Sequence, residues 1–505
     1  MLNKIYSLEE LKEKTDTLKK RGLTIGICHG LFDFIHPGHL NHLNLAKKSC
    51  DILIVTTTSD NFVKKSLFSP FFPEEQRKYY LSNLQMIDFV SVVNDETAEP
   101  AIKKIKPHFY FKGEEYKEND NIGNLSKEKK ICKKYNVKIK FIGEKKYSSS
   151  ELISKNLFLN HDQELIKNIK NLRKSRISID KIFDQAKNKK ILIIGEVIFD
   201  QYTFLLTHGL SPKSNNISGS IERDKMMGGG ALASTRFLKQ FTKNVDCLSI
   251  INKNIKKDFK RNELLKGING FIFSNEFPDI IKQRYIQKEN NVYSQKKLLT
   301  VNNFFNTKIS KIDEKKILSF LKKNIRKYDL VIVQDFDHGL INKTIAKYIN
   351  KNSKKLSLNS QTNSMNYGFN IINRKFRKAD MFSLDKTELE LYAGSKNIDY
   401  KKTLIKLKRD LKSKMGFLTL GPKFSLLSAK KTYKINALEQ NIVDAVGAGD
   451  IFHSFSSLLF LLTKNEFLNL FLSQIAGAHA VKILGNENFP KKNQILNTFK
   501  FFLNS

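Results

Sequence analysis

Histidine and glycine are concentrated in one stretch near the start of the chain, HGLFDFIHPGH over residues 29–39. It follows a short β-branched run, and ligands of open α/β sheets bind at the carboxyl ends of strands. Pro37 suits the first turn of a helix, which puts His36 at the helix start and His39 one turn further on the same face. Gly30 permits close backbone approach. The pattern predicts an anion site at a helix N-terminus; ordinary surface histidines or a metal pair are the alternatives.

A second reactive stretch, NIVDAVGAGDIFHSF over residues 441–455, lies near the other end of the chain. Gly447, Ala448 and Gly449 precede Asp450 and an apolar helix. Glycines leave backbone N–H groups open to an anion, and the helix dipole adds to their effect. A carboxylate beside bound phosphate is no phosphate ligand, so Asp450 is a candidate general base for an incoming hydroxyl. The alternative is a glycine-rich turn capped by aspartate.

Each stretch needs a sheet to position it, and two strand–glycine–helix beginnings supply candidates, at residues 23–30 and 189–200. Both are short β-branched runs followed by a glycine and a polar loop, as in the first strand of a parallel sheet. Further strands are expected in the first half over residues 51–60, 87–93, 106–113 and 137–143. Helical segments fill the gaps, which predicts a doubly wound sheet of five strands.

The second half repeats this alternation, with YDLVIVQDF, KKLSLNSQ, ADMFSLD and MGFLTLG as buried parallel strands. The expected fold class is therefore α/β, with two doubly wound parallel-sheet domains. Their expected boundaries are 1–160 and 186–505, joined by a helical connector over 161–185.

The chain carries 88 Lys+Arg against 50 Asp+Glu, a formal net charge of +38 over 505 residues. Such a balance favours acidic partners. Lysine and asparagine are spread evenly, however, without a basic arm or aromatic interleaving, and a general drift in composition would look the same. A specific nucleic-acid partner is therefore not expected.

The four cysteines include no CxxC pair, and their spacing predicts neither a zinc site nor a disulfide framework. Free thiols in a reducing compartment are therefore expected. The first segment lacks the apolar core of a signal peptide. The longest apolar run, near residues 458–462, is too short to span a bilayer. A cytoplasmic protein without a membrane partner is expected.

The first stretch fits the pattern GxFDxxHxGHxxxLxxA, which resembles the signature of the nucleotidylyltransferase superfamily, including cytidylyltransferases and adenylyltransferases. PEEQRKYYLSNLQMIDFV, FKGEEY and YSSSELI resemble further segments of that family in the same order. The resemblance implies a Rossmann-like fold and nucleotide contacts from Gly30, Phe32, Asp33, Gly38, Arg77, Lys112, Gly113, Ser148, Ser149 and Ser150. For the three serines, a plain helix cap is the alternative.

The resemblance also implies a reaction in which a sugar-phosphate oxygen attacks the α-phosphate of a nucleoside triphosphate and pyrophosphate leaves. Positioning and charge neutralisation carry such chemistry. His36 and His39 would stabilise charge on the phosphates, with Lys64 as a cationic helper. SLFSPFFP stands where relatives often carry a Gly-Arg-Pro stretch, which leaves the base and one phosphate contact open.

DAVGAGD resembles the DTxGAGD signature of ribokinase-like (PfkB-type) carbohydrate kinases. IGEVIFDQY, GGGALAS, VQDFDHGLI, LDKTELE and LTLGPKFSLL resemble other segments of that family. The resemblance implies a catalytic Asp450, with Mg²⁺ as the cofactor. It implies nucleotide contacts from Thr419, Gly421, Gly447, Ala448 and Gly449, sugar contacts from Asp200, Gly229, Gly230 and Arg284, and a magnesium shell from Asp385 and Glu388.

Departures from the kinase pattern occur on both sides of the site. The glycine-rich loop usually carries an asparagine that holds the sugar, and here Leu232 or Arg236 stands there. Asp385 replaces an asparagine, and Glu196 replaces the first acid of the GDxxxD segment. The amide-rich segment LNSQTNSMNYGFN, residues 358–370, either lines a polar pocket or forms a solvated loop.

Together the two halves resemble bifunctional heptose kinase/nucleotidylyltransferases, in which the kinase half comes first rather than second. The implied partners are ATP, a second nucleoside triphosphate (CTP or ATP) and a sugar or sugar phosphate; a homodimer is compatible with the resemblance. ATP would phosphorylate the sugar at its anomeric hydroxyl, and the second nucleotide would then activate it. The alternative keeps the transferase active and makes the kinase-like domain a sugar-sensing module.

Overall fold

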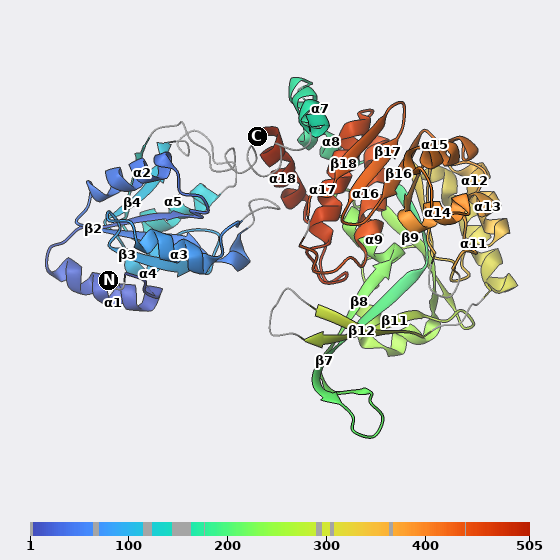
Figure 1. Ribbon diagram of the computed structural model, residues 1–505, viewed down its shortest axis with the longest axis horizontal. Helices are drawn as coiled ribbons and strands as arrows, with labels where there is room; N and C mark the ends of the chain where they lie inside the picture. The colour runs from blue at the N-terminus through green and yellow to red at the C-terminus, as the bar shows by residue number, and fades with distance from the viewer. Residues whose placement is uncertain are drawn as a thin grey trace. The chain divides into compact units, whose positions relative to one another are not determined.

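The computed structural model divides the chain into two compact units, unit 1 with residues 1–166 and 500–505, and unit 2 with residues 167–499 (Figure 1). Among the residues that the structure describes, no helix is long and apolar enough to cross a membrane. The described residues are 4–63, 70–114, 124–143, 163–175, 177–288, 295–303, 308–362, 367–439 and 441–504.

Unit 1 contains a five-stranded sheet of order β3-β2-β1-β4-β5, in which all neighbouring strands are parallel. Its elements are α1 (Leu8–Lys20), β1 (Ile25–Gly30), α2 (Pro37–Lys47), β2 (Ile52–Thr58), η1 (Asp60–Phe62), α3 (Glu74–Ser82), β3 (Phe89–Val93), α4 (Glu99–Ile105), β4 (Phe109–Gly113), α5 (Asn124–Lys134) and β5 (Lys138–Ile142).

Helices cover both faces of this sheet because its strands are apolar on both sides. Ile25 and Ile27 of β1 belong to a cluster that includes residues of α1, α4 and α5. Cys28, which follows Ile27, points to the opposite face of the sheet and packs with Leu43 of α2 and Leu81 of α3. The strand order reverses between β1 and β4, and ligands of such sheets bind in the crevice outside this point.

Unit 2 is built on a nine-stranded sheet of order β10-β9-β6-β13-β14-β15-β16-β17-β18, parallel from β10 to β16 and antiparallel beyond. Its strands are β6 (Ile191–Gly195), β9 (Val245–Asn252), β10 (Phe271–Ser274), β13 (Leu330–Asp335), β14 (Leu356–Ser360), β15 (Met381–Asp385), β16 (Met415–Thr419), β17 (Phe424–Ser428) and β18 (Thr432–Asn436).

Alternate residues of the central strands face opposite helical layers. Leu192 and Ile194 of β6 lie in a core cluster with Ile317 of α11 and Ile345 of α12. Phe455 of α16 packs on the other face with aromatic rings of α8 and α9. The helices are α7 (Gln163–Lys174), α8 (Ile179–Ala186), α9 (Ala231–Leu238), η3 (Lys253–Lys257), α10 (Phe259–Glu263), α11 (Lys311–Asn324), η4 (Ile325–Lys327), α12 (Lys343–Asn352), α13 (Ile372–Lys375), α14 (Lys386–Ala393), α15 (Tyr400–Asp410), α16 (Ala448–Leu462), α17 (Glu466–Ala480) and α18 (Lys492–Asn504).

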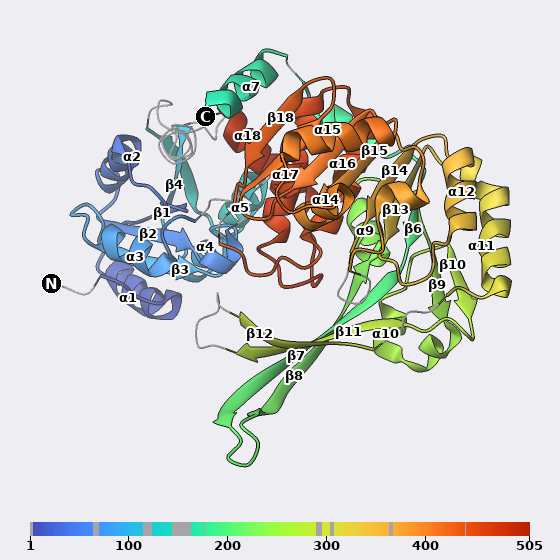
Figure 2. The same ribbon diagram turned by 45° about the vertical axis from the view of Figure 1, so that its right-hand side comes forward.

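The structure confirms the predicted fold class, two doubly wound parallel-sheet domains of the α/β class. It adds a four-stranded sheet of order β12-β11-β7-β8 that the sequence did not predict, here called the small sheet. Figure 2 shows it standing apart from the nine-stranded sheet. Its strands are β7 (Val197–Leu210), β8 (Ile217–Gly230), β11 (Ile280–Lys288) and β12 (Gln295–Asn302).

The domain boundaries 1–160 and 186–505 stay predictions. The division between the units falls inside α7, and α8 packs within unit 2 through Phe183, which contacts Phe241 and Phe455. The predicted connector 161–185 thus contains helices where it is described.

Candidate active sites

The first candidate site lies where β1 ends and α2 begins. Pro37 is the first residue of α2 and His36 is its N-cap, in an extended conformation. The imidazole rings of His36 and His39 are stacked, with centroids 3.9 Å apart and an interplanar angle of 25°. One helical turn therefore presents both histidines at the positive end of the helix, as the sequence predicted.

Phe32 closes the side of this site next to Gly30. Its backbone has φ +49°, uncommon for a bulky residue, and its carbonyl oxygen accepts a hydrogen bond from the Tyr80 hydroxyl. The Phe32 ring lies 5.5 Å from the ring of His39 between centroids. A Cβ on Gly30 would lie 3.2 Å from the same ring, so the glycine leaves room for Phe32 to pack.

Asp33 binds backbone rather than facing the helix terminus. Its carboxylate accepts hydrogen bonds from the N–H groups of Phe71, at 2.8 and 2.9 Å, and Phe72, at 2.9 Å. Asp33 is 4% exposed. These contacts make it a residue that holds the segment before α3 against the end of β1, and its predicted nucleotide contact finds no support in them.

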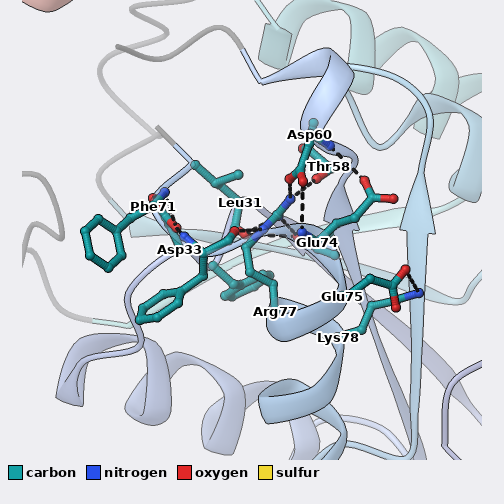
Figure 3. A network of polar contacts seen from close by, with 12 residues as sticks. Leu31, Asp33, Thr58, Asp60, Phe71, Glu74, Glu75, Arg77 and Lys78 are labelled. Atoms are coloured by element: carbon teal, nitrogen blue, oxygen red, sulfur yellow. Dashed lines mark hydrogen bonds and ion pairs between the residues drawn. The ribbon is translucent and has the colours of Figure 1, made fainter. Parts of the chain in front are cut away.

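Arg77 of α3 is fully buried and lies in a polar network at the carboxyl ends of β1 and β2 (Figure 3). Its Nε donates to the carbonyl of Phe72 at 2.9 Å, and one Nη atom donates to the carbonyl of Leu31 and to the Thr57 hydroxyl. The other Nη donates to the carbonyl of Thr58 at 2.9 Å and to Asp60 Oδ1 at 2.6 Å.

These contacts give Arg77 a positioning role within the protein, and its predicted contact with a nucleotide stays a prediction. A guanidinium has five N–H donors, and each of them here has an acceptor within the protein. Arg77 therefore positions the loops that frame the site, because it joins the ends of two strands to the start of α3.

Replacing Arg77 with methionine is expected to destabilise unit 1 by about 3–5 kcal/mol, because buried acceptors lose their charged donor. In the full-length protein, hydrogen exchange followed by mass spectrometry should show faster exchange in β1, β2 and α3 and little change in β13 to β16. Glu75→Gln is the matched control on the same helix, since Glu75 is 75% exposed and, among the described residues, pairs only with Lys78 (Figure 3). Equal protection in the two variants would contradict the positioning role.

Lys112 lies at the end of β4 and pairs with Glu128 of α5 at 2.9 Å. The Glu128 side chain is only 2% exposed, and Glu128 Oε1 also accepts a hydrogen bond from the N–H of Ala98. Gly113 follows Lys112 as the last residue of the strand. Lys112 is thus near the strand ends as predicted, with its charge balanced by a buried carboxylate.

Several predicted residues of this site lie outside the described part of the chain. They are Lys64, Ser148, Ser149 and Ser150. Their roles stay predictions.

The second candidate site lies where α16 begins. Gly447 is its N-cap and has φ +81°, a conformation that favours glycine. Within the described residues, the N–H groups of Gly449 and Asp450 have no acceptor, which is usual in the first turn of a helix. A Cβ on Gly449 would meet nothing within 4 Å. The turn therefore presents open N–H groups at a positive helix terminus.

Asp450 is the third residue of α16 and is 8% exposed. Its Oδ1 accepts hydrogen bonds from the side-chain amides of Gln361, at 2.7 Å, and Gln334, at 3.4 Å. Burial raises the pKa of Asp450 to about 6, although the Gln361 hydrogen bond and the charge of Lys282 act against it. Its Oδ2 has no hydrogen bond in the described part of the chain, so one oxygen is anchored and the other can take a proton.

The small sheet brings Asp200 and two cations to the same region. Lys282 of β11 lies beside Asp200 of β7 in the strand register, and the Arg284 guanidinium donates to Asp200 Oδ1. Burial raises the pKa of Asp200 despite these two cations, and burial lowers the pKa of Lys282 despite Asp200 and Asp450. Asp200 and Asp450 both lie near enough to Lys282 for their charges to act on its pKa.

Asp444 anchors the turn before α16 to the small sheet. Its buried carboxylate accepts hydrogen bonds from Lys297 Nζ of β12 and the Tyr202 hydroxyl of β7, both at 2.6 Å. The N–H of Val446 and the N–H of Gly485 also donate to it, at 3.1 and 3.0 Å. Burial alone would raise the pKa of Asp444, but the bonds from Lys297 and Tyr202 outweigh it and hold the pKa below its usual value.

The predicted magnesium ligands form a helix cap. Asp385 is the N-cap of α14, its Oδ1 accepts from the N–H of Glu388, and Glu388 Oε2 accepts from the N–H of Asp385, both at 2.8 Å. Burial, together with Asp385, raises the pKa of Glu388 well above its ordinary value, and Asp450 adds to the rise. Thr419 is the register partner of Asp385, and Gly421 follows it with φ +54°.

Glu196, which replaces the first acid of the family pattern, binds the loop after β13. Its carboxylate accepts from the N–H groups of Phe336 at 3.1 Å, His338 at 3.1 Å and Leu340 at 3.3 Å. Burial and the nearby Asp335 raise the pKa of Glu196 to about 7. Glu196 therefore shapes the loop that borders the site, and this role is open to either acid.

Sequence reasoning did not single out Gln334, Lys282, Lys297 or Asp444. Gln361 lay in the amide-rich segment 358–370, for which a polar pocket and a solvated loop were both open. The hydrogen bond from Gln361 to Asp450 supports the first alternative for the described part of that segment. Gln334 and Asp444 lie inside the quoted segments VQDFDHGLI and DAVGAGD, although no role was predicted for them. Lys282 and Lys297 lie in ordinary-looking strand sequence, where no local pattern marks them.

For the sugar phosphorylation that the kinase resemblance implies, the rate is expected to fall as the pH drops through about 6. A base must be ionised, and the raised pKa of Asp450 means that it gains a proton near that pH. The measurement is kcat/KM for the sugar between pH 5 and 9, with an expected ten-fold loss per pH unit below the inflection. The residual rate of Asp450→Asn should lack this inflection; a flat wild-type profile between pH 5 and 7 would argue against Asp450 as the base.

Residues 27–155 match the family model described as cytidylyltransferase-like. A bifunctional protein HldE from a Nitratiruptor strain is 35% identical over 130 residues, 25% of this chain and 28% of that relative. The Helicobacter pylori (strain J99) protein of the same description is 36% identical over 155 residues, 30% of this chain and 31% of that relative. The matches thus span less than a third of these relatives' lengths.

Solved structures similar to this chain include a ribokinase from Thermotoga maritima, 17% identical with a TM-score of 0.46 over 62% of this chain and 99% of that chain. Arabidopsis thaliana ribokinase, described as complexed with ribose and ATP, is 16% identical with a TM-score of 0.46 and the same coverages. Because these values are low, the case for a kinase rests on the residues of the second site.

Proposed function

We propose that this protein is a transferase with two active sites. Unit 2 would use ATP to phosphorylate a sugar of heptose type, and unit 1 would join the sugar phosphate to a nucleotide from CTP or ATP. One observation carries the proposal: at the carboxyl edge of each sheet, a glycine-containing turn opens a helix and holds reactive side chains. These are the stacked His36 and His39 in unit 1 and the buried Asp450 in unit 2.

In the kinase step, a sugar hydroxyl oxygen attacks the γ-phosphorus of ATP, the bond to the β-phosphate oxygen breaks, and ADP leaves. The hydroxyl proton passes to Asp450 Oδ2, since Oδ1 is held by Gln361. The open N–H groups of Gly449 and Asp450, with the helix terminus, would neutralise charge on the phosphoryl group. Asp200 would accept a hydrogen bond from another hydroxyl of the sugar.

Magnesium bound by ATP would neutralise phosphate charge in this step. No cluster of three or more metal-ligating side chains occurs among the described residues. Mg²⁺ often takes one or two carboxylates, with water and substrate phosphates completing its shell. Glu388, held by Asp385 and close enough to Asp450 for that carboxylate to raise its pKa, fits that requirement.

The charge of the site supports an acceptor that carries a phosphate away from the reacting hydroxyl. The ammonium of Lys282 has no hydrogen bond or ion pair within the described residues, although burial lowers its pKa. A buried cation is stabilised by a charged partner. Asp200 and Asp450 act on the charge of Lys282 without pairing with it, and a phosphate on the terminal hydroxyl of an aldoheptose would supply a direct partner that the free sugar would not.

In the transferase step, an oxygen of the sugar phosphate attacks the α-phosphorus of the second nucleotide and pyrophosphate leaves. His36 and His39 would bind the phosphates at the start of α2, where the helix terminus adds positive potential. Arg77, Asp33 and the Lys112–Glu128 pair would position the loops around them.

The test follows each step with the full-length protein. Incubation with ATP, Mg²⁺ and an aldoheptose, with or without a terminal phosphate, should give a mass increase of one phosphate on the sugar. Addition of CTP, ATP or GTP in separate reactions should then release pyrophosphate with one of them. Pyrophosphate release from an added sugar 1-phosphate without any phosphorylation of sugars would favour a sugar-sensing second unit instead.

A further inference from the structure

The side chain of Asn486 lies between the two glycine segments of the second site. Asn486 follows α17 in the sequence and is 7% exposed. A Cβ on Gly447, at the start of α16, would collide with Asn486 Oδ1, and a Cβ on Gly229, at the end of β8, would lie 3.2 Å from its Nδ2. Both glycines therefore leave space that the amide of Asn486 occupies.

Asp200 borders the same space. A Cβ on Gly229 would also collide with Asp200 Oδ2. The amide of Asn486 and the carboxylate of Asp200 thus meet at one glycine, with the turn of α16 on the far side of the amide. A carboxylate accepts hydrogen bonds and an amide both donates and accepts, so the two together suit neighbouring hydroxyls of a sugar.

The amide of Asn486 makes no hydrogen bond to any described residue. The side chain is 7% exposed, so water or a polar ligand can still reach the amide and complete its hydrogen bonds. A buried amide next to the candidate base and the anion turn is therefore suited to bind a polar ligand.

The backbone that carries Asn486 is held on both sides. The N–H of Gly485 donates to Asp444 Oδ2 at 3.0 Å, and Gly485 itself has φ +49°. On the other side, Glu487 pairs with Lys225 of β8. Because Asp444 also binds Tyr202 and the turn before α16, the amide is fixed relative to both glycine segments.

Neither residue at the family's asparagine position can replace this amide. Leu232 is fully buried and packs against Gly228. The Arg236 guanidinium is engaged with the carbonyl of Leu264.

We propose that Asn486 binds the acceptor sugar, donating a hydrogen bond to the hydroxyl next to the one that Asp450 deprotonates. The inference rests on the proposed kinase function. It makes the loop after α17 a determinant of sugar specificity.

The test uses Asn486→Ala and Asn486→Asp in the full-length protein with the aldoheptose that the wild type phosphorylates. Loss of one hydrogen bond that leaves buried partners unpaired is expected to raise KM for the sugar roughly ten-fold, with KM for ATP within about two-fold. The dissociation constant of the sugar, measured calorimetrically without ATP, should rise by the same factor. Asn486→Asp should be worse, because a second carboxylate then faces Asp200.

Asn488→Ala is the matched control, since Asn488 lies exposed in the same loop. A set of monodeoxy sugars adds a readout that loss of folding would not give. Wild type and Asn486→Ala should bind equally the one sugar that lacks the hydroxyl contacted by Asn486. If Asn486→Ala binds the intact sugar as tightly as wild type, or raises KM for ATP alone, the inference is overturned. If the wild type neither binds nor phosphorylates any sugar, the proposed kinase function fails first, and the inference with it.

Discussion

Asp450→Asn is expected to slow sugar phosphorylation by roughly 10²–10⁴-fold while pyrophosphate release from an added sugar 1-phosphate stays unchanged. The amide has the size of the carboxylate and can still accept from Gln361, so the start of α16 should keep its structure. It cannot take the hydroxyl proton. The initial rate of sugar phosphorylation is measured without a sugar 1-phosphate or second nucleotide, and the initial rate of pyrophosphate release is measured without the unphosphorylated sugar.

Asp184→Asn serves as the control, since that side chain is 61% exposed on α8 and its ion pair in the described part of the chain is with the exposed Lys187. It should change neither rate. An Asp450→Asn variant that retains phosphorylation within ten-fold of wild type would show that another group accepts the proton.

His39→Ala is expected to have the opposite selectivity, lowering pyrophosphate release roughly 10²–10³-fold and leaving sugar phosphorylation intact. The side chain lies against His36 and Phe32 at the end of β1, where charge on the phosphates would develop. Its removal takes away a preorganised donor without touching the strands. Pyrophosphate is measured with saturating sugar 1-phosphate and each nucleotide in turn.

Asn44→Ala, on the exposed side of the same helix, controls for general effects on α2. Unchanged pyrophosphate release in His39→Ala would remove this histidine from the site. A loss in both half-reactions would indicate a defect in folding rather than in catalysis.

The fold was predictable wherever strands are buried on both faces. Runs such as ILIIG in β6 and the central residues of β13 are apolar throughout, because helices cover both sides of a parallel sheet. The small sheet escaped prediction because much of β8, as in SGSIERDK, is exposed and lacks an alternating apolar pattern. Its existence also depends on the pairing of the β7–β8 hairpin with β11, which is distant from it in sequence.

The candidate sites were predictable where a short motif holds its own geometry. The helix starts at His36 and Gly447 follow from proline and glycine placed next to a strand or a turn. Arg77 illustrates the opposite case. The motif predicts that Arg77 contacts the nucleotide, but it does not record that the side chain is buried and donates to the carbonyls of Phe72, Leu31 and Thr58.

Asn486 and Lys282 could not be found from local sequence at all. Each stands in unremarkable sequence, and each reaches the site because a distant element folds beside it. Asn486 is positioned by Asp444 and the glycine at 229, and Lys282 by its register with Asp200. Such residues are set by tertiary structure, which no spacing rule records.

The most direct test of the two-site account is complementation between the two inactive variants. Each reaction contains ATP, Mg²⁺, the second nucleotide and a sugar whose anomeric hydroxyl is not phosphorylated. Asp450→Asn alone should make no nucleotide-linked sugar, and His39→Ala alone should stop at the sugar phosphate. Mixed in one reaction, the two proteins should restore the nucleotide-linked sugar, because the phosphate made by one is activated by the other. A mixture that yields none, although each variant keeps its remaining half-reaction, would contradict two sites acting in sequence on one sugar.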